Sequence, residues 1–229
     1  MIYGNGMLAN AFSKLTDIRS DICIFASGVS DSGCEDETEF RRERILLEKS
    51  LKENASANYF IYFSSCSIID RSISDSPYVN HKLQMESLVL KHPQSIVFRL
   101  PQVIGPRGNP KNFVNFLYRS IKEDREFELW EKATRNIIDV DDVVEIVKYY
   151  IDGVSNGDNI VNVANPFNYS VIEVVNVIES FLNKKARYRV LSKGVKYAID
   201  ISKISTIIQK KNISFEGDYL MKILNKYYS

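Results

Sequence analysis

The chain is poor in the residue types that build disulfide frameworks and metal sites. Its 229 residues include only three cysteines, Cys23, Cys34 and Cys66, and these form no C-x-x-C pair. An odd, scattered set of this kind argues against a disulfide framework and favours a reducing compartment, so we expect a cytoplasmic protein. The only histidines are His81 and His92, and with two of them no metal site is expected.

The chain also lacks a surplus of charge and a long apolar run. Lys+Arg 30 against Asp+Glu 29 leaves a formal net charge of +1, which gives no support to a nucleic-acid or anionic-membrane partner. No stretch of about 18 apolar residues is present, so no transmembrane helix is expected. The opening residues have no basic segment leading into an apolar run, and no signal peptide is expected. With 45% hydrophobic and 26% charged residues, the composition is that of a globular domain.

Strand-like and helix-like patterns alternate along the whole chain. Amphipathic helical patterns separate apolar runs of buried-strand type, which lie at 1–3, 22–26, 59–63, 95–100 and 159–164. This alternation predicts an α/β fold, a doubly wound parallel sheet with helices on both faces. Ligands bind such sheets at the carboxyl ends of the strands, so we expect functional residues just after the strands.

A glycine-rich turn follows the first strand. Gly4, Gly6 and Ala9 have the spacing G-x-G-x-x-A between a strand and a helix. In a dinucleotide site the first glycine permits a tight turn, the second lets a pyrophosphate approach the backbone, and the small third residue permits close helix packing. The alternative is an ordinary strand-to-helix turn.

A tyrosine and a lysine have the spacing of a catalytic pair. Tyr78 and Lys82 share one face of a predicted helix, and a nearby ammonium lowers the pKa of a phenol. A tyrosine in that position can act as an acid or base. The same spacing recurs at Tyr118 and Lys122, which we interpret as an amphipathic surface pair. Only the first pair follows a strand that ends in hydroxyl residues, among them Ser65.

In this order, the motifs resemble the extended short-chain dehydrogenase/reductase family, which contains NAD-dependent sugar-nucleotide epimerases, dehydratases and reductases. The resemblance extends over nearly the whole chain. Its segments are the glycine turn, 25–28, 62–65, the pair Tyr78 and Lys82, 99–108, 135–142 and 200–203.

The resemblance implies a role for each matched residue. Tyr78 would be the general acid/base, Lys82 would lower its pKa and hold the nicotinamide ribose, and Ser65 would orient the reacting oxygen. The implied cofactor-binding residues for NAD or NADP are Gly4, Gly6, Ala26, Ser27, Tyr78, Lys82 and Pro101. The implied substrate-binding residues are Ser65, Cys66, Gln102, Arg107 and Arg135, of which Arg135 would hold a diphosphate through a planar, bidentate contact.

The chain departs from the family pattern before its second strand. Gly6 and Ala26 are only 20 residues apart, where the family has two further strands and a helix that hold the adenosine. We therefore expect a Rossmann-like sheet truncated at the adenosine-binding side, with the first strand at or near a sheet edge. Binding of NAD or NADP should be weak or unselective. The expected division is a shortened dinucleotide-binding core over 1–150, with 102–134 partly in a substrate lobe, and the remaining core strand and substrate-lobe elements over 151–229.

Two functions remain open from the sequence. The first is an NAD(P)-dependent oxidoreductase or epimerase that acts on a nucleotide-linked sugar by 4-keto reduction or epimerisation, in surface-polysaccharide biosynthesis. The alternative is a degenerate, non-redox family member that binds a nucleotide sugar or a partner protein. The presence of Ser65, Tyr78, Lys82 and Arg135 favours the enzyme. A homodimer is expected in either case.

Overall fold

The larger part of the molecule is built on one parallel sheet. The computed structural model describes residues 1–15, 21–106, 108–153 and 159–229. Its central sheet has the spatial order β1 (Ile2–Tyr3), β2 (Ile22–Phe25), β3 (Tyr59–Ser65), β4 (Ser95–Leu100) and β8 (Ile160–Asn162), with every neighbouring pair parallel. β2, β3 and β4 are buried almost throughout because both faces of the sheet are covered, which explains their nearly continuous apolar sequences. The predicted α/β class is confirmed.

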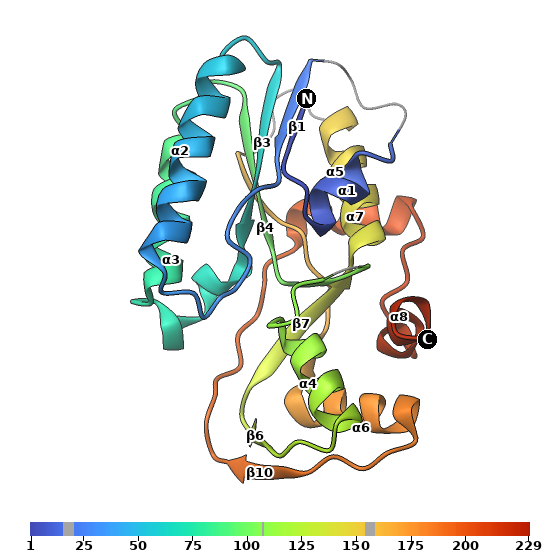
Figure 1. The fold of residues 1–229 in the computed structure, drawn as a ribbon. Helices are drawn as coiled ribbons and strands as arrows, with labels where there is room; N and C mark the ends of the chain where they lie inside the picture. Colours follow the sequence, from blue (N-terminus) through green and yellow to red (C-terminus); the bar gives the residue numbers. More distant parts are fainter. Residues whose placement is uncertain (16–20, 107, 154–158) are drawn as a thin grey trace.

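Helices cover both faces of this sheet (Figure 1). One face carries α1 (Met7–Phe12), α5 (Val140–Gly153) and α7 (Ser202–Lys210), and the other carries α2 (Glu37–Glu53) and α3 (Pro77–Val89). The starts of α2 and α3 follow from local chemistry. The side chain of Asp36 accepts from the backbone amide of Thr38, and Ser76 accepts from Val79 while proline occupies the first turn of α3.

β1 is the outermost strand of the sheet, as the short spacing after the glycine turn predicts. Among the described residues it pairs with β2 alone. The terminal ammonium of Met1 donates to the carbonyl oxygen of Ile22 at 2.6 Å and extends this pairing. The adenosine-side edge of the described sheet therefore lies at its first strand.

A smaller lobe lies beyond the carboxyl ends of the central strands (Figure 1). It contains a three-stranded sheet, a two-stranded sheet and three helices. These are β5 (Gln102–Ile104), β7 (Thr134–Asp139) and β9 (Asn168–Ser170); β6 (Phe127–Trp130) and β10 (Tyr188–Leu191); and α4 (Phe113–Lys122), α6 (Val171–Leu182) and α8 (Tyr219–Tyr227). Two short 3-10 helices, Cys66–Ile69 and Arg71–Ile73, connect β3 to α3. Ser170 and Glu173 form a capping box at the start of α6.

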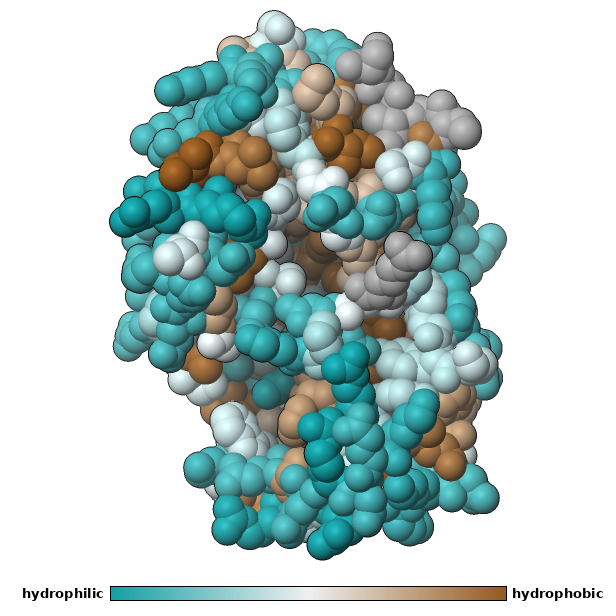
Figure 2. Space-filling model, viewed as in Figure 1, coloured by the Kyte–Doolittle hydropathy of each residue, from teal (hydrophilic) through white to brown (hydrophobic). Residues whose placement is uncertain are grey.

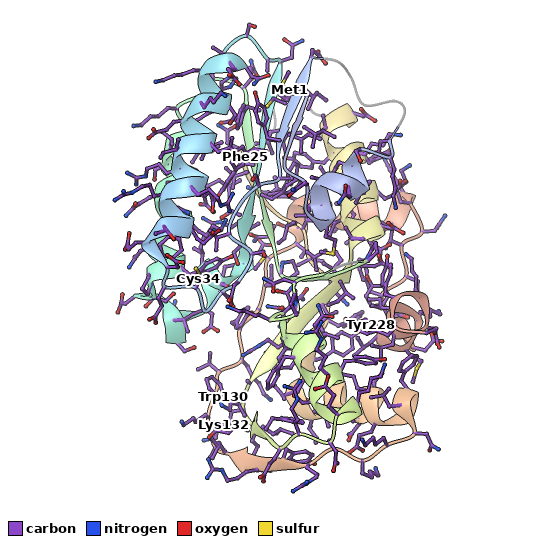
Figure 3. The ribbon with its side chains drawn as sticks, viewed as in Figure 1. Met1, Phe25, Cys34, Trp130, Lys132 and Tyr228 are labelled. Carbon is purple, nitrogen blue, oxygen red and sulfur yellow. The ribbon has the colours of Figure 1, made fainter. Side chains whose placement is uncertain are left out.

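The C-terminal helix is fastened to the turn between β7 and α5. Asp139 accepts hydrogen bonds from the Lys226 ammonium and the Tyr227 hydroxyl, both at 2.7 Å. Tyr228 packs against Tyr118 of α4, with ring centroids 4.6 Å apart. Figure 3 shows Tyr228 beside α4, and it places Trp130 and Lys132 at the end of the small lobe farthest from Met1. Within the described residues, no helix combines the length and the apolar character needed to cross a bilayer.

Candidate active site

A cavity of about 320 Å³ lies where the central strands end and the small lobe begins. Figure 2 shows the molecule hollowed near its middle, with hydrophobic residues at the bottom of the hollow. The volume is at the lower end of the range found for small-molecule sites. The cavity brings together seven of the residues that the sequence analysis singled out: Gly6, Ala26, Ser65, Tyr78, Lys82, Pro101 and Gln102.

Two of the remaining candidates shape the neighbourhood of the cavity without lining it. Gly4 has a φ of +125°, and a Cβ atom there would lie 2.4 Å from the carbonyl oxygen of Ala26, so the turn requires glycine. Ser27 is engaged by Arg42, whose guanidinium donates to its carbonyl oxygen at 3.2 Å.

Two substrate candidates do not line the cavity either, and the structure does not describe the third. The Cys66 thiol donates to the carbonyl oxygen of Arg99 at 3.3 Å, and burial raises its pKa to about 12. In this structure the Cys66 thiol is turned into the protein and does not line the cavity, so its role in substrate binding stays a prediction. The guanidinium carbon of Arg135 lies 5.4 Å from the ring centroid of Phe113, and the guanidinium donates to the carbonyl oxygen of Thr134. Arg107 lies outside the described residues.

Tyr78 and Ser65 form the polar wall of the cavity. Tyr78 sits in the first turn of α3, its side chain is buried, and it lines the cavity beside Ser65. Ser65 ends β3, and its Oγ accepts from the backbone amide of Ser67 at 3.1 Å. Burial raises the pKa of Tyr78, although the Lys82 charge and the Ser65 hydrogen bond each lower it. The expected lowering by Lys82 is thus present, but burial outweighs it and the protonated phenol is the stable form.

Lys82 is held in a buried ion pair that the sequence analysis missed. Its Nζ lies 3.0 Å from Oε1 and 3.3 Å from Oε2 of Glu43, and it donates to the Tyr62 hydroxyl at 3.2 Å. The Lys82 side chain is 3% exposed and that of Glu43 is 0% exposed. Gly28 makes room for this pair, because a Cβ atom at that position would lie 2.7 Å from the Lys82 ammonium and 3.0 Å from Glu43.

The signal for Glu43 was present in the sequence. Phe40, Glu43, Leu47 and Ser50 repeat at helical spacing and form the buried stripe of α2. A single carboxylate on an otherwise apolar stripe must find a cation or several donors in the interior. Glu43 was not among the candidate residues predicted from the sequence.

Two features of the cavity indicate a ligand with polar atoms. Ser64 is one of the lining residues, and its hydroxyl oxygen is buried with no hydrogen-bond partner among the described residues. At Gly6 a Cβ atom would meet nothing within 4 Å, so the missing side chain leaves open space in the cavity wall. An unpaired buried hydroxyl is costly unless a ligand or water satisfies it.

Two loops meet at the rim of the cavity. The Asn109 side-chain amide donates to the Ser30 hydroxyl at 3.2 Å, and Lys111 lies 3.4 Å from a carboxylate oxygen of Asp31. Ser30 and Asn109 line the cavity. The loop after β2 and the loop before α4 therefore define its opening together.

Comparisons with known proteins agree with this fold. The model of a family described as the NAD-dependent epimerase/dehydratase family matches residues 10–164. The matched range begins after the glycine turn and includes Ser65, Tyr78, Lys82 and Arg135. No curated protein matches the chain significantly.

Solved structures share the fold at low sequence identity. The chain is similar to a UDP-glucuronic acid 4-epimerase from Bacillus cereus in complex with NAD, with a TM-score of 0.73 and 19% identity over 95% of this chain and 74% of that one. It is similar to the enzyme WbmH from Bordetella bronchiseptica in complex with NAD+ (TM-score 0.70, 17% identity, 96% and 78% covered). It is also similar to a UDP-glucose 4-epimerase from Thermus thermophilus in complex with NAD (TM-score 0.68, 13% identity, 94% and 80% covered). The Rossmann-like fold is confirmed.

Proposed function

Since the chain belongs to the NAD-dependent epimerase/dehydratase family, we propose that it is an NAD(P)-dependent enzyme that epimerises or reduces a nucleotide-linked sugar. One observation carries the proposal. Ser65, Tyr78 and Lys82 line one cavity at the carboxyl end of the sheet, with the glycine turn on another part of its wall. The similar structures named above include epimerases of UDP-sugars, which supports a UDP-sugar as substrate.

The cavity suits a nicotinamide nucleotide. The space at Gly6 admits a ligand close to the backbone, and the Ser64 hydroxyl offers it an unused donor and acceptor. Gly4, Gly6, Ala26, Ser27 and Pro101 would surround the cofactor. Bound nicotinamide supplies the hydride chemistry, which no protein side chain provides.

The residues of this chain supply proton transfer and orientation. Tyr78 gives a proton to, or takes one from, the reacting sugar oxygen, and Ser65 orients that oxygen by a hydrogen bond. Lys82 holds the nicotinamide ribose from the wall of α3. Gln102 lines the substrate side, and Arg135 and Arg107 would bind the substrate, with Arg135 on the diphosphate.

We expect the purified protein to bind NAD and to convert a UDP-sugar. Calorimetric titration with NAD and with NADP measures the first property, and chromatography of UDP-glucose or UDP-glucuronic acid incubated with the loaded protein measures the second. Because β1 is at the sheet edge, the described sheet has no strand beyond it against which the adenosine could bind. The two dissociation constants should therefore lie within about tenfold of each other, and both affinities should be weak.

Three outcomes of this experiment would change the conclusion. Submicromolar binding of one cofactor with a hundredfold preference would show that another segment rebuilds the adenosine site. Binding of a UDP-sugar without binding of either cofactor would favour the degenerate, non-redox family member. Failure to bind any of these compounds would refute the proposed function.

The proposed setting is cytoplasmic synthesis of a surface polysaccharide. All three cysteines are free, and two of them, Cys23 and Cys66, are buried, which supports a reducing compartment.

A homodimer through α2 and α3 is part of the proposal. The outer surface of these helices exposes Ile45 (59%) and Leu83 (39%), and Figure 2 shows hydrophobic residues over the middle of α2. Arg44 donates to Gln84 at 2.6 Å and joins the two helices into one surface. Exposed large apolar side chains such as these two can be buried by a second copy of the chain.

The double substitution Ile45→Glu and Leu83→Glu is expected to convert the dimer to a monomer. Two carboxylates would have to be desolvated in the interface, which is costly. Sedimentation equilibrium measures the change. Trp130→Glu, at an exposed residue of the small lobe, is the matched control and should leave the mass unchanged. A wild-type protein that is monomeric at all concentrations would contradict the assignment.

A further inference from the structure

A carboxylate with no exposure to solvent lies directly behind the cavity wall. Glu43 projects from α2 into the space between α3 and the end of β2. Its Oε1 accepts from the Tyr62 hydroxyl at 2.6 Å and from the Lys82 ammonium at 3.0 Å. Its Oε2 accepts from the Val29 amide at 2.7 Å and lies 3.0 Å from Nε2 of His81. Both oxygens are thus satisfied by protein groups.

The surroundings of Glu43 keep it ionised. Burial on its own opposes ionisation, but the Lys82 charge and the hydrogen bonds from His81, Tyr62 and Val29 outweigh it and lower the pKa of Glu43 to about 2. An ionised carboxylate only accepts, so the His81 Nε2 carries the proton and donates it. Glu43 is therefore a fixed negative charge in contact with the Lys82 ammonium.

The ion pair of Glu43 and Lys82 lies close enough to Tyr78 to act on it electrostatically. The Lys82 ammonium lies 5.8 Å from the ring centroid of Tyr78 and 5.4 Å from that of Tyr62. The charged groups that act on Tyr78 are Lys82 on the same helix, Glu43 on α2 and Asp31 on the loop after β2. Glu43 and Lys82 thus act on the site together, with opposite signs.

We propose that Glu43 is a positioning residue of this site: it fixes the Lys82 ammonium in the cavity wall and cancels its charge, so that the wall is electrically neutral toward the nicotinamide. The proposal rests on the proposed function, because it concerns the same cavity. Two observations carry it, namely the complete burial of both side chains and the close approach of Gly28, which leaves Lys82 no space to move toward the β2 loop.

Neutrality of the wall has a measurable consequence. The oxidised nicotinamide ring carries a positive charge, and the reduced ring carries none. An uncompensated ammonium within about 10 Å, at an effective dielectric constant of about 20, would change their relative affinities by about tenfold or more. With Glu43 in place, this penalty on the oxidised form is removed.

The test is the ratio of the dissociation constants of NAD+ and NADH in the Glu43→Gln variant. Glutamine keeps the size of the side chain and loses the charge, so the ratio should move at least tenfold in favour of NADH. For a two-electron couple this is a rise of about 30 mV in the potential of the bound cofactor. A purely structural role would weaken both forms equally and leave the ratio unchanged.

Glu86→Gln is the matched control. Glu86 lies on α3, is as buried as the site residues, and forms a two-bond ion pair with Arg99 at 2.9 and 2.6 Å outside the cavity. Its loss also breaks a buried pair, but the ratio should stay within threefold of wild type. A Glu43→Gln ratio within threefold of wild type, or an equal change in Glu86→Gln, overturns the proposal.

The double variant Glu43→Gln with Lys82→Met keeps the proposal open to refutation if the single variant does not fold. Both charges are then removed, and the pair is as neutral as in the wild type, so the ratio should return to within threefold of the wild-type value. A ratio displaced tenfold in the double variant overturns the proposal. A wild-type protein that binds neither NAD+ nor NADH refutes the proposed function, and this inference with it. Binding of both by the wild type with an unmoved ratio in Glu43→Gln refutes the inference alone.

Discussion

Replacement of Tyr78 by phenylalanine is expected to lower turnover of the proposed nucleotide-sugar substrate by about 10² to 10⁴, the usual contribution of a general acid or base. The ring remains in its buried position in α3, so packing changes little. The phenolic hydroxyl is lost from the cavity that Tyr78 and Ser65 line, and with it the only transferable proton of that side chain. Steady-state turnover and the dissociation constant of NAD, measured on the same preparation, separate a chemical defect from a binding defect.

Tyr118→Phe is the control for this variant. Tyr118 and Lys122 repeat the Y-x-x-x-K spacing on α4, and Lys122 Nζ even donates to the Tyr118 hydroxyl at 3.3 Å. Tyr118 packs against Phe181 and Tyr228 in the small lobe and does not line the cavity. The turnover of the Tyr118→Phe variant should stay within a factor of a few of wild type. If Tyr78→Phe behaves in the same way, Tyr78 has no part in proton transfer.

The two tyrosines show why the sequence could indicate Tyr78 as the candidate acid or base. Local spacing alone does not distinguish Tyr78 from Tyr118. The position in the alternating pattern does, because only Tyr78 follows the strand that ends in Ser65, and parallel strands present their carboxyl ends at one edge. The same reasoning predicted β1 at the sheet edge from the 20 residues between Gly6 and Ala26.

The small lobe could not be predicted in the same detail. β5, β7 and β9 have three to six residues each, and their pairing brings together segments far apart in the chain, such as Arg135 opposite Tyr169. Strands this short have too few residues to show a period, and partner strands decide their conformation. The orientation of Cys66 is of the same kind, because it depends on the carbonyl oxygen of Arg99 in a neighbouring strand.

Glu43 is the most consequential residue that sequence reasoning passed over. Its partners come from three other segments: Val29 after β2, Tyr62 in β3, and His81 and Lys82 in α3. Nothing in the local sequence of α2 identifies those partners. The lysine that the family resemblance presents as a catalytic cation is, in this chain, half of a buried ion pair.

This ion pair should make the fold sensitive to acid. The pKa of Glu43 is lowered from 4.5 to about 2 in the folded protein, mainly because the Lys82 charge and three hydrogen bonds overcome the cost of burial. A carboxyl whose pKa is lower in the folded state stabilises the protein above its unfolded pKa. That stabilisation is fully present above about pH 5 and is lost as the pH falls through 4.5 toward 2. This lowering of the Glu43 pKa corresponds to about 3 kcal/mol in the free energy of unfolding.

We therefore expect wild type and Glu43→Gln to differ in free energy of unfolding by about 3–5 kcal/mol at pH 7, the usual result of breaking a buried pair. The difference should shrink as the pH falls from 4.5 toward 2, because protonation of Glu43 then leaves Lys82 unpaired in the wild type as well. Urea unfolding followed by circular dichroism at a series of pH values measures both curves. Glu39→Gln, on the same helix, removes an exposed carboxylate paired with Arg42 at 3.1 Å and should cost less than about 1 kcal/mol at any of these pH values. If the curves of wild type and Glu43→Gln run parallel from pH 7 to pH 2, the carboxylate of Glu43 is not held ionised by the fold, and the neutral-wall assignment loses its electrostatic basis.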